Sequence, residues 1–222
     1  TAEHDDALIF NVTDNQVRQL HPDGQWSEPD ALPSPPVEVV MESHAPAPSR
    51  EALGERFQPL PTPTYEPGPS MDHLMPSERV GWASRTLDAL SEPGVQDIPG
   101  KQAIVAEAML SSKAVRDAVL LHARSPEQVE ALVQVYRGAP PQGREDLAAA
   151  AAMTMYVRNW PRVGVETALS HAGQNNLGRL VNLGIRNDLN PLPLVGDLER
   201  QMPAQLVKAD ATWEAERAAA TR

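Results

Sequence analysis

Apolar residues recur at helical spacing through most of the chain from Ser77 onward. Val80, Ala83, Leu87 and Leu90 are separated by three, four and three residues, which places them on one face of a helix. Similar patterns predict helices over 101–110, 113–123, 144–157 and 161–172, and a last helix from Pro203 towards the end. The side chains that we expect to be buried are Val80, Leu87, Val119, Leu132, Tyr136, Met155, Leu169, Leu180 and Val181.

Two helix starts carry clear capping signals. Ser125-Pro126-Glu127-Gln128 precedes an apolar face, so Ser125 can cap, Pro126 suits the first helical position and Gln128 can complete a capping box. Asn175 can cap a later helix that carries Leu177, Leu180 and Val181. These signals predict short loops between neighbouring helices and therefore antiparallel helix pairs.

The beginning of the chain has strand rather than helix periodicity. Leu8, Phe10 and Val12 alternate with other residues, and 13–16 offers turn chemistry before an apolar return over 17–20. We therefore expect a β-hairpin within 1–21. Because two strands alone are marginal in water, this edge needs cover. The helical half, a second copy of the chain or a separate upstream polypeptide could supply it, and the upstream polypeptide is favoured.

Proline separates these two parts. Thirteen of the 22 prolines lie between Pro22 and Pro76, where they prevent a long helix or a central strand. We interpret 22–76 as a proline-rich irregular connector with short ordered islands at 37–41 and at 49–57, the latter with Ser49 as N-cap. The predicted fold is α+β and predominantly α: hairpin 1–21, connector 22–76 and helical domain 77–222.

Composition narrows the class of protein. The net charge is −11, and residues 1–110 carry 18 acidic against 6 basic residues. This balance argues against nucleic acid as a partner, because neutralising phosphates needs clustered cations. The chain has no cysteine and no apolar run long enough to span a membrane, so a cytoplasmic protein without membrane contact is expected.

Signatures of catalysis are absent from the sequence. The six histidines form no ligand-spaced cluster; the closest approaches to a metal or acid–base pair are Glu42 with His44 and Asp72 with His73. There is no Gly-x-Ser-x-Gly elbow and no glycine-rich phosphate loop. We therefore predict no catalytic residue, no metal and no cofactor.

One group of residues suggests binding. Arg158, Arg162, Arg179 and Arg186 lie on consecutive helices or their ends, within an acidic protein. Paired helices could bring them onto one concave surface, where guanidinium groups would suit a carboxylate or phosphate. The alternative is an ordinary solvated helix surface.

Several stretches resemble an actinobacterial family catalogued as domain of unknown function number 4192. They are Asp6-Ala7-Leu8-Ile9 through Trp26, Pro48-Ser49-Arg50-Glu51-Ala52-Leu53, Val115-Arg116-Asp117-Ala118-Val119-Leu120, and the region from Leu147 to Pro191, with Ala168-Leu169 and Asn187-Asp188-Leu189-Asn190-Pro191. The chain departs from the family in lacking a cysteine at 21–26 and in having Asn159-Trp160-Pro161 where the family has Gly-Asp-Gly.

The resemblance implies that the chain corresponds to the second half of the family, with an α/β half upstream, and it supplies no known activity. The helices from Leu147 also resemble tetratricopeptide packing in small residues such as Ala151, Gly164 and Ala168, without a 34-residue repeat. The leading interpretation is a helical protein-interaction module. The alternative is a hydrolase or nucleotide-processing enzyme whose active site lies in, or is shared with, the upstream half.

Overall fold

The computed structural model describes residues 10–13, 16–19, 30–31 and 49–221 of the 222-residue chain. Contacts divide the chain into two units, Thr1–Ala47 and Pro48–Arg222. The first unit contains strands β1 (Phe10–Thr13), β2 (Gln16–Gln19) and β3 (Asp30–Ala31), paired antiparallel in the order β1-β2-β3. Parts of the hairpin expected within 1–21, and the whole island at 37–41, lie outside the described residues, so both remain predictions.

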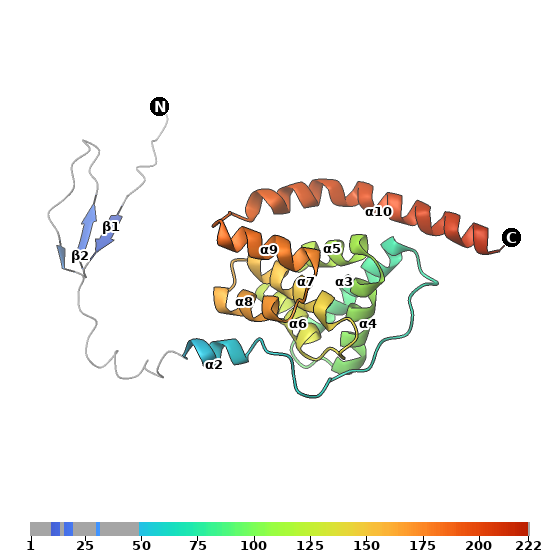
Figure 1. Ribbon diagram of the computed structural model, residues 1–222, viewed down its shortest axis with the longest axis horizontal. Coiled ribbons are helices and arrows are strands. Elements are labelled where there is room, and N and C mark those ends of the chain that lie inside the picture. The colour runs from blue at the N-terminus through green and yellow to red at the C-terminus, as the bar shows by residue number, and fades with distance from the viewer. Residues whose placement is uncertain (1–9, 14–15, 20–29, 32–48, 222) are drawn as a thin grey trace, which may run out of the picture. The chain divides into compact units, whose positions relative to one another are not determined.

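The second unit is built from helices, which confirms the prediction of a predominantly α-helical chain (Figure 1). The helices are α2 (Arg50–Glu55), α3 (Pro76–Ser91), α4 (Ile98–Ser111), α5 (Lys113–His122), α6 (Pro126–Arg137), α7 (Arg144–Val157), α8 (Arg162–Ser170), α9 (Asn176–Arg186) and α10 (Leu192–Ala220). Helices that follow each other closely in sequence pack together in the pairs α3/α4, α4/α5, α6/α7 and α7/α8.

Helix α7 is the centre of this unit. It packs against α4, α5, α6, α8 and α9, and its residues from Leu147 to Met155 are all buried. Alanine strongly favours helix and has only a methyl side chain, so the run Ala148–Ala152 lets several neighbours approach one helix closely. The alanine-rich sequence therefore determines both the helix and its central place.

Most of the expected core is confirmed. Of the nine side chains expected to be buried, six are at most 3% exposed: Leu87, Val119, Leu132, Tyr136, Met155 and Val181. Val80 and Leu169 are partly buried and pack against the same core. Leu180 contradicts the prediction because it is 44% exposed. Helix α9 packs on α7 with its Val181 side, and Leu180 lies beside that contact rather than within it.

The segment before α3 is part of the helical unit rather than of a connector that extends to residue 76. Ser49 caps α2 as expected, since its Oγ accepts a hydrogen bond from Ala52 N at 3.1 Å. Phe57, Tyr65 and Met71 are each at most 6% exposed and belong to the core. Tyr65 Oη also donates to Val135 O on α6 at 2.7 Å. Irregular backbone thus follows the helical surface because a few large side chains anchor it.

Helix α10 begins earlier than the predicted start at Pro203. It runs from Leu192 to Ala220 across α3 and α5, with Pro203 inside it (Figure 1). Proline in a helix interior removes one hydrogen bond and normally favours a break. Here Val195 and Met202 are buried on the N-terminal side of the proline, so packing holds that part of the helix in place.

The capping box at α6 is present as predicted. Ser125 Oγ accepts a hydrogen bond from Gln128 N at 3.2 Å, and Gln128 Oε1 accepts one from Ser125 N at 3.0 Å. Pro126 occupies the first helical position. The side chains of Ser125 and Gln128 therefore give hydrogen-bond acceptors to two backbone amides that would otherwise lack them.

Replacing Ser125 with Ala should lower the free energy of unfolding by about 0.5–2 kcal/mol, since the Gln128 amide loses its acceptor. Chemical denaturation followed by far-UV circular dichroism measures this loss. Ser77→Ala is the matched control, because no hydrogen bond of the Ser77 hydroxyl is found in the described part of the chain. Equal stability of the two variants would contradict the assignment of Ser125 as a stabilising cap.

Candidate functional site

A groove with predominantly apolar walls lies between α5, α9 and the beginning of α10, with α7 contributing to its floor. Its volume is about 530 Å³, within the range of about 300–1,000 Å³ that is usual for ligand sites. The apolar side chains that define it are Leu120, Met153, Leu177, Leu180, Leu194 and Leu198. We call this feature the leucine groove.

Leu177 and Leu180 form the α9 wall of the groove. Gly178, Val181 and Gly184 are buried, and a methyl group on Gly184 would lie only 2.6 Å from Tyr156 Oη of α7. Close approach of α7 and α9 therefore uses this glycine-containing face. Leu177 is partly buried, and Leu180 is 44% exposed because it faces the groove instead.

The polar groups of the leucine groove are mostly paired with one another. Arg116 Nη2 lies 2.7 Å from Asp117 Oδ1, and Asn175 Nδ2 donates to Asp146 Oδ1 across the space between α9 and α7. Lys113 is exposed at the edge. The lining therefore holds two cations and two carboxylates, with no net charge to attract a charged ligand into the groove.

The polar residues that line the leucine groove do not form a nucleophile–base pair in the described part of the chain. The one hydroxyl that lines it belongs to Ser112, whose Oγ accepts a hydrogen bond from Val115 N and caps α5. No histidine lines the groove. Acyl transfer would require a nucleophile beside a base, and in the described residues no base is hydrogen-bonded to the Ser112 hydroxyl.

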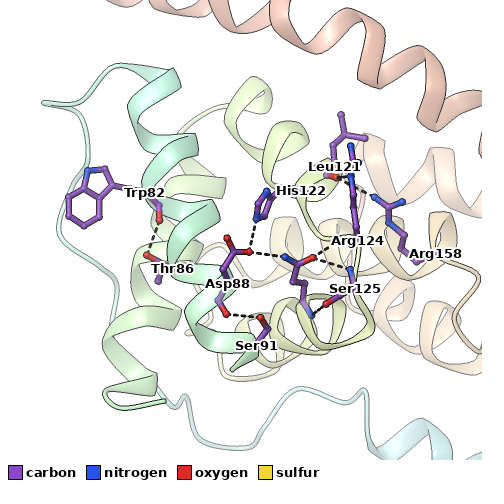
Figure 2. A network of polar contacts seen from close by, with 10 residues as sticks. Trp82, Thr86, Asp88, Ser91, Leu121, His122, Arg124, Ser125 and Arg158 are labelled. Atoms are coloured by element: carbon purple, nitrogen blue, oxygen red, sulfur yellow. Dashed lines mark hydrogen bonds and ion pairs between the residues drawn. The ribbon is translucent and has the colours of Figure 1, made fainter. Parts of the chain in front are cut away.

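A polar cluster elsewhere in the helical unit joins three helices (Figure 2). Asp88 Oδ1 of α3 is 2.7 Å from His122 Nε2 of α5 and accepts a hydrogen bond from Gln128 Nε2 of α6 at 2.7 Å. Gln128 is also the capping-box residue that binds the Ser125 amide. A carboxylate beside an imidazole can orient a catalytic histidine.

A catalytic triad would also need a hydroxyl nucleophile beside the histidine. In the described residues no hydroxyl is hydrogen-bonded to His122, and the hydroxyl of Ser125 is used in capping. Asp88 instead connects the end of α5 and the beginning of α6 to α3 (Figure 2). These hydrogen bonds therefore hold three helices together. They also give the His122 ring a hydrogen-bond partner on the otherwise apolar face of 113–123.

Of the four arginines predicted to form one binding surface, Arg158 and Arg162 turn to different partners. Arg158 Nε donates to Ala123 O at 2.9 Å, and its Nη2 donates to Leu121 O at 3.2 Å. Figure 2 shows the contact with Leu121 at the end of α5. Burial, followed by the nearby Arg124, lowers the pKa of Arg158. Both of these hydrogen bonds are to backbone carbonyls of its own chain.

Arg162 begins α8 and forms an ion pair with Glu166 on the same helix at 2.8 Å. Glu166 also binds Arg50 at 2.6 Å, and its hydrogen bond with Arg162 is the largest cause of its lowered pKa. Arg179 and Arg186 are exposed on α9. A joint anion-binding role of the four arginines remains a prediction.

In the described part of the chain, no group of three histidine or acidic side chains is placed so that it could hold a metal ion. His44 and Glu42 lie outside that part, and His73 is exposed. Among the described helices, none is both long enough and apolar enough to cross a membrane.

Fold and groove together define a helical domain with an open apolar groove. No family model, curated protein or solved structure matches the chain. The resemblance to the domain family of unknown function therefore remains a prediction. The residues that sequence reasoning missed are the groove leucines of α9 and α10. Periodicity gave no signal for them, since Leu177, Leu180 and Leu183 are three residues apart on α9 and lie on one side of the helix, as core residues do.

Proposed function

We propose that this chain is a helical protein-interaction module whose leucine groove binds an amphipathic helix of a partner protein. The observation that carries the proposal is the exposure of Leu180 in a groove of about 530 Å³ between three helices. Apolar surface that remains exposed in a groove gains free energy when a partner covers it.

A helical occupant agrees with the shape and charge of the groove. Leu177 and Leu180 are three residues apart on α9 and form a ridge beside a furrow, which is the surface against which a second helix packs. Amphipathic helices commonly bind such grooves through apolar residues at positions i, i+3, i+4 and i+7. Because the charges that line the groove balance, an apolar stripe fits better than a charged segment.

The alternative, a hydrolase or nucleotide-processing enzyme, has less support. It would require convergent polar groups in a pocket, whereas the leucine groove presents paired ions and leucines. We also keep a cytoplasmic location and a partner on a separate polypeptide as parts of the proposal. The competing explanation is that the groove binds a second copy of this chain, and an experiment distinguishes the two.

The proposal can be tested with a phage library of 20-residue helical peptides that carry leucine at i, i+3 and i+7. The full chain should enrich leucine-striped peptides, and Leu180→Asp should weaken the best of them by at least about tenfold, because a carboxylate would then face apolar side chains. Fluorescence anisotropy with the labelled peptide measures the change.

Val207→Asp is the control, because Val207 is 70% exposed on α10 and does not line the groove. It should bind the peptide as the unchanged chain does. Failure to enrich any such peptide, or equal binding by Leu180→Asp, would contradict the proposal. A dimer in light scattering that Leu180→Asp dissociates would assign the groove to self-association and likewise overturn a partner helix.

A further inference from the structure

A second pocket of about 650 Å³ lies where the C-terminal part of α10 passes the beginning of α3 and the turn between α4 and α5. It shares one lining residue, Ser112, with the leucine groove. Figure 1 shows this part of α10 extending along the bundle towards the C-terminus. Three cationic side chains line the pocket: Arg79 of α3 and Lys208 and Arg217 of α10. The hydroxyl residues Ser111, Ser112 and Thr212 also line it.

Arg79 is the unusual member of this group because it is buried. Its side chain is only 6% exposed, yet the guanidinium makes a single hydrogen bond in the described part of the chain, from Nε to Leu74 O at 2.9 Å. Asp72 Oδ1 forms an ion pair with Nη2 at 3.8 Å, which is too long for a hydrogen bond, and the Asp72 side chain is 88% exposed. A buried cation is costly unless its donors are satisfied.

The α10 side of the pocket is held in position. Trp213 Nε1 donates to Asp72 O at 3.0 Å, and the Arg217 guanidinium carbon lies 4.8 Å above the Trp213 ring. Arg217 Nη1 also donates to His73 O at 3.3 Å. One further contact joins the same elements, since Asp210 Oδ1 accepts from Ser77 N at 2.9 Å. Cations on a fixed helix lose little freedom when they bind a ligand.

The charge around the pocket is locally positive although the chain as a whole carries −11. Three cations line it against two carboxylates, those of Asp72 and Glu216. Asp72 already accepts a hydrogen bond from Ser70 Oγ at 2.8 Å. Glu107, whose pKa burial raises, is close enough to interact with Arg79 electrostatically but is not within ion-pair distance. Neither neighbour supplies the bidentate partner that a buried guanidinium accommodates best.

We propose that this pocket binds a dianionic oxyanion of the phosphate-monoester class, held by the Nη groups of Arg79 and by Lys208. Arginine offers a planar fork that matches phosphate oxygens, and lysine adds a point charge. This site is distinct from the leucine groove, and it uses none of the four arginines expected from the sequence.

The test is a titration of the full chain with inorganic phosphate, with chloride at matched ionic strength as reference, followed by ¹H–¹⁵N spectra. Phosphate should produce a saturable shift of the Trp213 indole signal, identified with Trp213→Phe, whereas chloride should not. Lys208→Gln should weaken phosphate binding by about tenfold, since one charge-assisted contact is lost. Arg79→Gln should weaken it further.

Arg200→Gln is the matched control, because Arg200 lies on the same helix but does not line the pocket. It should bind phosphate as the unchanged chain does. The binding result for Arg79→Gln is interpreted only if the circular dichroism spectrum of that variant is unchanged. Lys208 is exposed, so Lys208→Gln should fold normally and keeps the test decisive if Arg79→Gln does not fold. An equal response to chloride, no saturable shift, or full binding by Lys208→Gln would overturn the proposal.

Discussion

Replacing Phe57 with Ala should lower the free energy of unfolding of the helical unit by about 3–5 kcal/mol. Phe57 is 3% exposed and packs its ring against α8, where a methyl group on Gly164 would lie 2.9 Å from Phe57 Cζ. The ring also meets Trp160 edge to face, with centroids 6.3 Å apart. The expected loss combines the transfer of this ring to water with the cavity that remains.

Chemical denaturation followed by circular dichroism provides the measurement. Leu192→Ala is the control, because Leu192 is 60% exposed and its truncation should change stability by no more than about 0.5 kcal/mol. A loss below about 1 kcal/mol for Phe57→Ala would show that the segment before α3 does not belong to the folded unit. It would also restore the boundary at Ser77 that the sequence suggests.

Leu132→Ala should cost about 2–5 kcal/mol, because Leu132 lies on the buried face of α6 and is 3% exposed. Nearby large side chains such as Tyr136 can relax only partly into the space left behind. Thermal unfolding should show a clearly lower midpoint. Leu183→Ala on α9, 55% exposed in the native chain, should leave the midpoint almost unchanged. Similar midpoints for the two variants would remove Leu132 from the core.

The sequence by itself determined where most helices form. Ser125 and Gln128 identify the start of α6 because capping is a local hydrogen-bonding property of four consecutive residues. Arg144–Val157 coincides with α7 because alanine favours helix whatever surrounds it. Asn175 caps α9 for the same local reason, through its Oδ1 and the Leu177 amide at 2.8 Å.

Local signals failed where packing overrides them. Pro203 looks like a helix start, yet α10 continues through it because Val195 and Met202 are buried on its N-terminal side. The prolines before Pro76 indicate irregular backbone, and much of it is irregular. Their number could not show that Phe57 and Tyr65 attach this backbone to the core, since those contacts join residues about 70 or more positions apart.

Only the tertiary structure decided the sites. Periodicity marks Leu180 as apolar, but whether a neighbouring helix covers it depends on how α9 lies on α7, which glycines and Val181 control. Arg158 and Arg79 are both arginines near helix ends in sequence. Folding satisfies Arg158 with the backbone carbonyls of Leu121 and Ala123 at the end of α5. The guanidinium of Arg79 instead lies beside a pocket, with the Asp72 carboxylate 3.8 Å from its Nη2. Residue type determines which groups a side chain can bind. The packing of distant helices determines whether groups of the same chain already bind it.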